Sequence, residues 1–146
     1  MRMLKHVTRF HTKFGLEYNG QPRAVKAEMA EFRHKFGREE LDEYLLHNGL
    51  ALKAIEKGDR ESYEEELNHV LDALVDQMYV LMGTIYLHGM GKVFRRAWNR
   101  VQRANMSKVR ATSAEQSKRG STLDVVKPEG WVAPCHRDLV SVNEAP

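Results

Sequence analysis

Residues 39–43 are Glu39-Glu40-Leu41-Asp42-Glu43, and this acidic run continues an apolar helical stripe. The stripe has the 4-3-4 spacing of one helix face and consists of Val25, Met29, Phe32 and Phe36. Glu40 and Glu43 fall on the same face, so the side that should enter the core ends in carboxylates. An ionised carboxylate is costly to bury unless a cation compensates its charge, and the pattern therefore predicts a divalent metal site.

A second acidic pair, Asp72 and Asp76, stands at i and i+4 of a later helical segment. Side chains three or four residues apart share a helix face, so two such helices crossing would bring the acidic pairs together. The predicted metal ligands are Glu40, Glu43, Asp72 and Asp76. Ligation by oxygen alone favours Mg²⁺, or Mn²⁺ in its place, and Mg²⁺ commonly also binds substrate phosphates. The pattern thus predicts metal-assisted attack of water on phosphorus.

Helical periodicity covers most of the chain up to residue 110. The predicted helices span residues 2–14, 22–47, 50–57, 62–87 and 92–110. Pro22 suits the first turn of the second helix, and Asn48-Gly49 should end it. Ser62 and Glu65 have the spacing of a capping box. Beyond residue 111 the periodicity is lost, and no segment alternates like a strand between hairpin signals.

These elements predict an all-α fold with one domain. We expect a four- to five-helix bundle in residues 1–111, with residues 112–146 as an extended C-terminal arm of the same domain. The main core stripe of the helix at 62–87 should be Leu67, Leu71, Leu74, Met78, Met82 and Ile85. Gly83 on its other apolar face should let a second helix or another subunit approach closely.

Charge is distributed unevenly along the sequence. Residues 39–76 hold twelve acidic and three basic side chains, whereas residues 92–127 hold ten basic and two acidic ones. This asymmetry suits an acidic metal site facing a cationic wall that binds polyphosphate, or simply two solvated faces of opposite sign. Two further alternatives stay open. The basic segment could bind nucleic acid, or the acids could form buried ion pairs with Arg33 or Arg95.

Cysteine usage and hydropathy bear on the compartment. Cys135 is the only cysteine, so no internal disulfide can form and a reducing cytoplasm is the natural location. The basic amino terminus is not followed by an apolar core of a secretory signal. The longest apolar run, residues 78–87, is too short to cross a bilayer, so no membrane association is expected.

The acidic motifs resemble a known signature. Glu39-Glu40-Leu41-Asp42-Glu43 followed by Asp72-Ala73-Leu74-Val75-Asp76 is similar to the EExxE…ExxD pattern of MazG-like all-α nucleoside triphosphate pyrophosphohydrolases. The resemblance covers about residues 5–135, is closest to short single-domain forms from phages and bacteria, and includes Phe10-His11, Phe14-Gly15, Arg103-Ala104-Asn105-Met106-Ser107-Lys108 and residues 127–134. Ala73 departs from the pattern, which has Glu there, and Asp72 is the candidate to replace that ligand.

The resemblance implies Mg²⁺-dependent hydrolysis of a (d)NTP between the α- and β-phosphates, giving (d)NMP and pyrophosphate. The phage MazZ-type members convert dGTP to dGMP, so dGTP or GTP is a specific expectation, with the host cytoplasm as location. Homo-oligomers, dimers or tetramers, are also implied. The implied catalytic residues are Glu39, Glu40, Glu43 and Asp76, with Glu39 as a ligand, an orienting group or the base. The implied substrate-binding residues are Asn105, Lys108, Lys127 and Arg119. For Trp131, an anchor of the arm is favoured over stacking on a base.

Overall fold

The structure, a computed structural model, describes residues 2–141, so residues 142–146 of the predicted arm lie outside it. Its elements in chain order are α1 (Arg2–Lys13), α2 (Ala27–Glu56), α3 (Arg60–Leu87), α4 (Gly91–Met106), β1 (Val109–Arg110), the 3₁₀ turn η1 (Ala114–Gln116), β2 (Val125–Val126) and α5 (Arg137–Val140). The predicted all-α class is confirmed. The chain divides into two compact units, one up to Gly91 and one from Lys92 onward. The predicted division after residue 111 stays a prediction.

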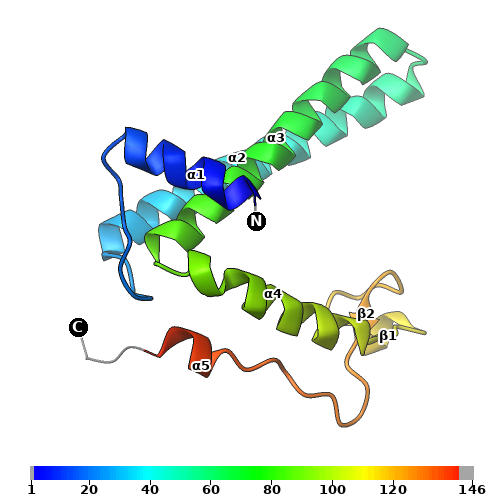
Figure 1. Cartoon of the computed structure of the whole chain (residues 1–146). Helices are drawn as coiled ribbons and strands as arrows, with labels where there is room; N and C mark the ends of the chain where they lie inside the picture. Colours follow the sequence, from blue (N-terminus) through cyan, green and yellow to red (C-terminus); the bar gives the residue numbers. More distant parts are fainter. Residues whose placement is uncertain (1, 142–146) are drawn as a thin grey trace. The chain divides into compact units, whose positions relative to one another are not determined.

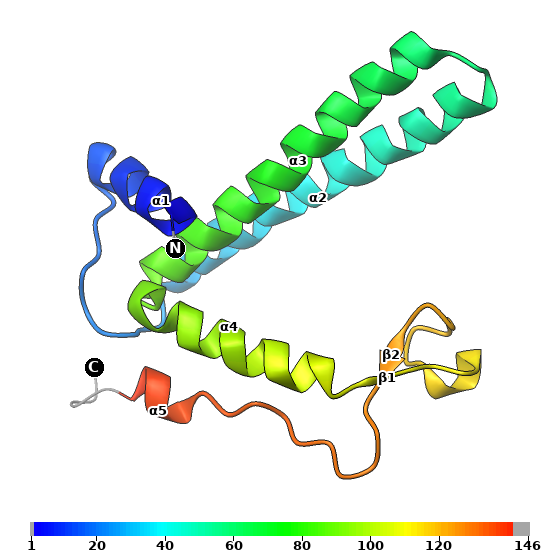
Figure 2. The same ribbon diagram turned by 45° about the vertical axis from the view of Figure 1, so that its right-hand side comes forward.

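Helices α2 and α3 form a long antiparallel hairpin, which is plain in both Figure 1 and Figure 2. The hairpin turns at Gly58, whose positive φ of 69° a residue with a Cβ would adopt only with strain. Asp59 then caps α3, because its carboxylate accepts from the Ser62 backbone N–H at 3.1 Å and from the Ser62 hydroxyl at 2.7 Å. The predicted capping box was therefore wrong. Ser62 is a donor to the cap and not the cap itself.

Helix α2 is one continuous helix, not the two predicted at 22–47 and 50–57. A glycine in a helix interior destabilises the helix by about 1 kcal/mol relative to alanine. The packing of α2 against α3 outweighs this cost at Gly49. The helix also starts later than Pro22. The segment before it is held by the end of α3, since the Arg23 N–H donates to the His88 carbonyl at 3.0 Å and Arg23 Nε donates to the Leu87 carbonyl at 3.2 Å.

The faces that α2 and α3 turn toward each other combine small residues with polar and larger ones. The covered positions of α2 include Arg33, Gly37, Glu40, Tyr44, His47, Ala51 and Ala54. Those of α3 include Val70, Ala73, Gln77, Val80, Thr84 and Leu87. Met82 is buried as predicted, but the prediction was wrong for the exposed Phe32, Leu67, Leu71, Leu74 and Met78. Small residues allow two helices to pack closely, so this pair uses its small face and leaves its larger apolar side chains outside.

Helix α1 packs on α3 through Val7 and His11, both buried. The His11 ring lies 4.8 Å from the ring of Tyr86, and its Nδ1 bonds to the Val7 carbonyl at 2.9 Å. The prediction for Gly83 is confirmed, because a Cβ there would lie 3.1 Å from His11 Cε1 and 2.8 Å from Arg33 Nη2. Glycine at this position lets α1 and the Arg33 side chain approach α3.

In the second unit, α4 is followed by a short antiparallel pair in which Val109 faces Val126. The arm then returns along α4, as Figure 2 shows, and is held by Arg100, which bonds Asp138 at 2.6 and 2.8 Å. Helix α4 ends at Met106, short of the predicted 110, because the Lys108 N–H closes a turn on the Asn105 carbonyl at 3.1 Å and the chain then enters β1.

Helix α3 is long and apolar enough to cross a membrane by length and composition. A core helix passes the same test, and α3 pairs with α2 and carries Asp72 and Asp76 in its apolar part. The absence of membrane association stays a prediction.

Candidate active site

The carboxylate of Glu40 occupies the covered face of α2, where the residue is only 7% exposed. Within residues 2–141, no side chain forms an ion pair or a hydrogen bond with this carboxylate. Its backbone carbonyl accepts a hydrogen bond from Gln77 Nε2 of α3 at 3.2 Å. Glu40 is thus a covered acid without a counterion on the hairpin between α2 and α3.

The surroundings of Glu40 are negative. Burial raises the pKa of its carboxyl group, and the neighbouring charges raise the pKa further, in the order Asp76, Glu43, Glu39 and Asp72. Two of these acids come from α2 and two from α3. The structure therefore brings the acidic residues of both predicted motifs together around one covered carboxylate.

Only Glu40 is covered, however. Glu39, Glu43, Asp72 and Asp76 are exposed in this chain, so the prediction that Glu43 also enters the core was wrong. The covered face follows the spacing 33-37-40-44-47, which places Tyr44 where the apolar stripe predicted Glu43. The exposed carboxylates form a rim beside the buried one.

The donor set fits a hard divalent cation in its chemistry. All the acids offer oxygen, and a buried carboxylate that has only negative neighbours is stabilised by a cation. In the described part of the chain no three His, Cys, Asp or Glu side chains already converge on one point as metal ligands. Glu40, Glu43, Asp72 and Asp76 are the residues that would hold the ion.

The structure does not support the alternative that the acids form buried ion pairs. Among residues 2–141, no arginine or lysine pairs with any of the four predicted metal ligands. Arg33 donates from Nε to Thr84 Oγ1 at 3.1 Å and from Nη2 to the Val80 carbonyl. Neither Arg33 nor Arg95 forms a salt bridge among residues 2–141. The remaining acid of the motif, Asp42, points to solvent and pairs with Arg38 at 3.5 Å.

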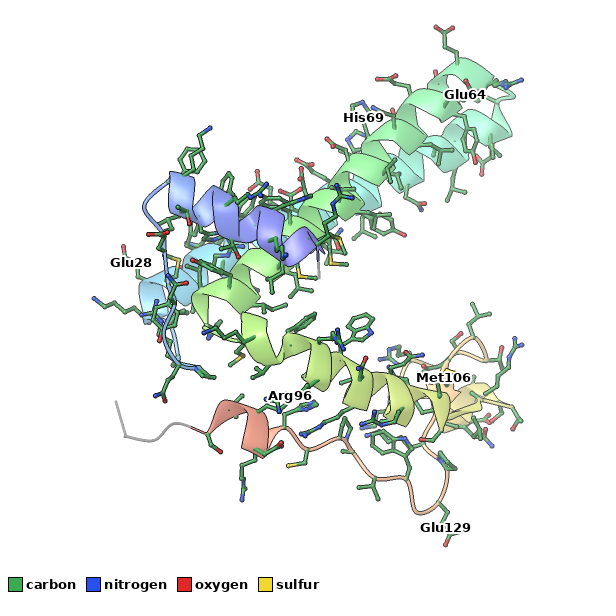
Figure 3. The ribbon with its side chains drawn as sticks, in the orientation of Figure 1. Glu28, Glu64, His69, Arg96, Met106 and Glu129 are labelled. Carbon is green, nitrogen blue, oxygen red and sulfur yellow. The ribbon has the colours of Figure 1, made fainter. Side chains whose placement is uncertain are left out.

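A histidine cluster that the sequence analysis missed lies nearer the hairpin tip. His47 Nδ1 bonds Glu66 at 2.6 Å, and the His47 ring stacks on His69 with centroids 4.5 Å apart. Figure 3 labels His69 and, closer to the tip, Glu64. The seven-residue spacing of Glu40 and His47, which places both on one face of α2, could have predicted that His47 is covered near the acids. This cluster links α2 to α3 beside the carboxylates.

In the second unit, three of the four predicted substrate-binding residues line one cavity. Lys108, Arg119 and Lys127 border a space of about 500 Å³ together with Lys118. Arg119 Nη1 also contacts both Asp124 oxygens at 2.9 Å. Asn105, at the end of α4, is not among the residues that line this cavity.

The Trp131 ring lies beside two of these cations, Lys108 and Lys127. Its Nε1 donates to the Ala104 carbonyl at 2.9 Å, and Lys127 Nζ lies 4.5 Å from the ring centroid. The hydrogen bond ties the arm to α4, as expected of an anchor, and the choice between anchoring and stacking on a base stays a prediction. Hydrogen bonds from Ser117 and Arg119 lower the pKa of Asp124, so this acid stays charged and holds the loop between β1 and β2.

Comparison with known protein families gives a match over most of the helical part of the chain. The family model for phosphoribosyl-ATP pyrophosphohydrolase matches residues 7–105, which include α2, α3 and all the clustered acids. Among curated proteins, no sequence matches the chain. The match covers well over half of the chain and assigns it a nucleotide pyrophosphohydrolase activity in general terms. The chain therefore belongs to the phosphoribosyl-ATP pyrophosphohydrolase family, within the MazG-like all-α nucleotide pyrophosphohydrolases.

Proposed function

We propose that this protein is a Mg²⁺-dependent (d)NTP pyrophosphohydrolase that cleaves between the α- and β-phosphates and releases (d)NMP and pyrophosphate. The observation that carries the proposal is the covered Glu40 carboxylate, which lies without a counterion among carboxylates of two helices. Family membership supports the reaction class. Mn²⁺ is expected to replace Mg²⁺, because the ligands are oxygens only.

Each acid has a proposed role. Glu40, Glu43, Asp72 and Asp76 hold the metal, with Asp72 taking the place of the acid that Ala73 lacks. Bound Mg²⁺ supplies the positive charge that a pyrophosphate leaving group needs. Glu39 lies on the exposed rim, where it accepts a proton from the attacking water or orients a metal ligand.

The cationic cavity of the second unit is the proposed site for the substrate phosphates. Lys108 and Lys127 provide compact positive charges, and both face the Trp131 ring, at 5.8 and 4.5 Å from its centroid. Arg119 has donors left beyond its contact with Asp124, and Asn105 contributes an amide near the end of α4. Charged lysines and arginines are suited to a polyphosphate because it carries several negative oxygens.

A homo-oligomer, a dimer or a tetramer, is proposed from the outer face of the hairpin. Large apolar side chains are exposed there on both helices, namely Leu45, Leu46, Leu52, Ile55, Leu67, Leu71 and Val75. Large exposed apolar patches on a protein surface mark interaction sites. A second copy of the hairpin would cover them. The cytoplasm is the proposed compartment, because the chain has a single, exposed free cysteine, Cys135.

The narrower proposal is a preference for dGTP or GTP, which rests on the resemblance to phage forms. The competing substrate is phosphoribosyl-ATP, which the name of the family model specifies. A second candidate function is that of a small basic nucleic-acid-binding protein. Its support is the excess of basic side chains in residues 92–127.

The test is a panel of all NTPs, dNTPs and phosphoribosyl-ATP with Mg²⁺, followed by phosphorus NMR. We expect a monophosphate and pyrophosphate in equal amounts from a (d)NTP. Release of single phosphates, or turnover of phosphoribosyl-ATP alone, would contradict the proposal. Salt-sensitive duplex binding with no hydrolysis would favour the nucleic-acid alternative.

A matched set of variants assigns the activity to the acids. Glu43→Gln and Asp76→Asn should each lower turnover about a hundredfold or more. Asp42→Asn is the control, because Asp42 belongs to the same acidic run but pairs with Arg38 in solvent. Its turnover should stay close to that of the wild type.

A further inference from the structure

A cavity on the α2–α3 hairpin is used by none of the roles above. It has a volume of about 430 Å³ and is bordered by the polar Arg33, Gln77 and Thr84 and the apolar Leu74, Met78 and Leu81. Binding sites for small molecules are concave, mostly apolar and supplied with a few polar groups. This cavity has that composition.

Arg33 is the unusual member of the cavity wall. It is partly covered, burial lowers the pKa of its guanidinium, and no carboxylate pairs with it in the described part of the chain. Its Nε donates to Thr84 Oγ1 at 3.1 Å and its Nη2 to the Val80 carbonyl, so its plane is fixed. A guanidinium has five N–H donors, so three of them have no acceptor among residues 2–141.

The absence of a side chain at Gly83 leaves the space that the Arg33 guanidinium occupies. A Cβ at Gly83 would lie 2.8 Å from Arg33 Nη2, too close for any other residue without a shift. The Val80 carbonyl does not depend on Arg33, since the Thr84 hydroxyl also donates to it at 3.0 Å. Arg33 is therefore not needed to satisfy the Val80 carbonyl, and its remaining N–H donors are available to a ligand.

The cavity lies next to the acidic cluster on the same face of α2. Arg33, Gly37 and Glu40 follow one another at spacings of four and three residues. At 1.5 Å rise per residue, Arg33 and Glu40 are about 10 Å apart along the helix. Gln77 borders the cavity and bonds Glu40, and its neighbour in sequence is Asp76. A nucleotide whose phosphates reach the acids can place its base at Arg33.

We propose that this cavity binds the nucleobase of the substrate and that Arg33 recognises a base edge with two adjacent acceptors. The proposal rests on the proposed function. A guanidinium fork pairs with two neighbouring acceptors, as in its contact with guanine O6 and N7. Cytosine O2 and N3 offer the same chemistry, whereas neither adenine nor thymine has two such adjacent acceptors. The cavity thus selects guanine or cytosine nucleotides.

The experiment measures binding without turnover. Isothermal titration with Mg²⁺ would use the α,β-methylene analogues of dGTP, dCTP, dATP and dTTP on wild type and on Arg33→Met. We expect the wild type to bind the dGTP or the dCTP analogue about tenfold more tightly than the dATP and dTTP analogues. Arg33→Met should lose this preference and keep its affinity for the dATP and dTTP analogues within about twofold.

Two further variants and one analogue separate recognition from structure. Arg38→Met is the control on the same helix, since Arg38 is exposed and pairs with Asp42, and it should keep the preference. Arg33→Lys keeps the positive charge but lacks the two parallel N–H donors of a guanidinium, so it should also lose the preference. This variant tests the proposal if Arg33→Met fails to fold. If guanine is the base, a 7-deaza analogue should bind the wild type as weakly as the unmodified analogue binds Arg33→Met.

The outcomes distinguish the two proposals. A preference that survives in both Arg33 variants, or an equal loss of affinity for all four analogues, overturns the base site. Arg33-dependent preference without pyrophosphate release from hydrolysable nucleotides leaves the base site standing and overturns the proposed reaction.

Discussion

The side-chain amide of Gln77 on α3 donates a hydrogen bond to the backbone carbonyl of Glu40 on α2, at 3.2 Å. Glu40 is the covered acid of the cluster, and Asp76 is the residue next to Gln77. The bond therefore ties α3 to α2 beside Glu40 and Asp76. Small residues around it, such as Gly37 and Ala73, allow the helices to stay close.

Replacing Glu40 by glutamine should raise the stability of the metal-free protein and abolish its activity. Because burial and four negative neighbours raise the pKa of Glu40, its ionised form destabilises the metal-free fold at neutral pH. A group with a raised pKa in the fold stabilises it at low pH and loses that contribution as pH rises. Glu40→Gln should therefore raise the melting temperature without metal at pH 7, by a few degrees, and abolish turnover. A lower melting temperature with retained turnover would contradict the role of Glu40.

Removal of divalent ions should lower the melting temperature of the wild type. A ligand that binds only the folded state adds about 2.7 kcal/mol at a concentration one hundred times its dissociation constant. Differential scanning calorimetry with Mg²⁺ and with a chelator measures the difference. Glu43→Gln should lose this difference, whereas Asp42→Asn should keep it. Equal melting curves for the wild type under both conditions would speak against a metal site.

A charge on the outer apolar face should dissociate the proposed oligomer. Leu71 is 63% exposed in the single chain, and a second copy would cover it. Leu71→Glu should reduce the molar mass measured by light scattering to that of one chain. Leu123 is even more exposed, at 86%, but lies outside the hairpin, so Leu123→Glu should leave the mass unchanged. A monomeric wild type would refute the assembly.

Alanine at two helical glycines should have opposite effects. Gly83→Ala places a Cβ 2.8 Å from Arg33 Nη2 and 3.1 Å from His11 Cε1, so overpacking should cost about 1–3 kcal/mol. Gly49→Ala meets nothing within 4 Å and should stabilise α2 by up to about 1 kcal/mol. Urea unfolding of both variants measures the two changes, and a stabilising Gly83→Ala would show that Arg33 does not need this space.

The anchor of the C-terminal arm should persist to low pH. The hydrogen bonds from Arg100 lower the pKa of Asp138 from 3.8 to about 2. A carboxyl group with a lowered pKa stabilises the fold above its ordinary pKa, and this contribution falls as pH drops from 3.8 and is lost below about 2. Carbon NMR of the Asp138 carboxyl group should show this midpoint, and in Arg100→Met the midpoint should return toward 3.8.

The sequence predicted the helices better than their packing. The 3.6-residue periodicity gave the existence of all four long helices, but Asn48-Gly49 was wrongly read as a helix end. A local glycine cost is small compared with the packing of thirty residues against a second helix. The arm was predicted as extended, and its short strand pair depends on Val109 meeting Val126, residues whose contact no local pattern specifies.

Sequence by itself determined the helical class, the two acidic pairs and the oxygen-only donor set, because spacing along a helix and side-chain chemistry are local properties. Only the tertiary structure decided that Glu40 is covered while Glu43 faces water, and that Arg33 rather than Phe32 enters the hairpin. The sequence predicted that the main apolar stripes of α2 and α3 would enter the core. The helices join through the faces that let them approach most closely, and that choice depends on two segments meeting at once.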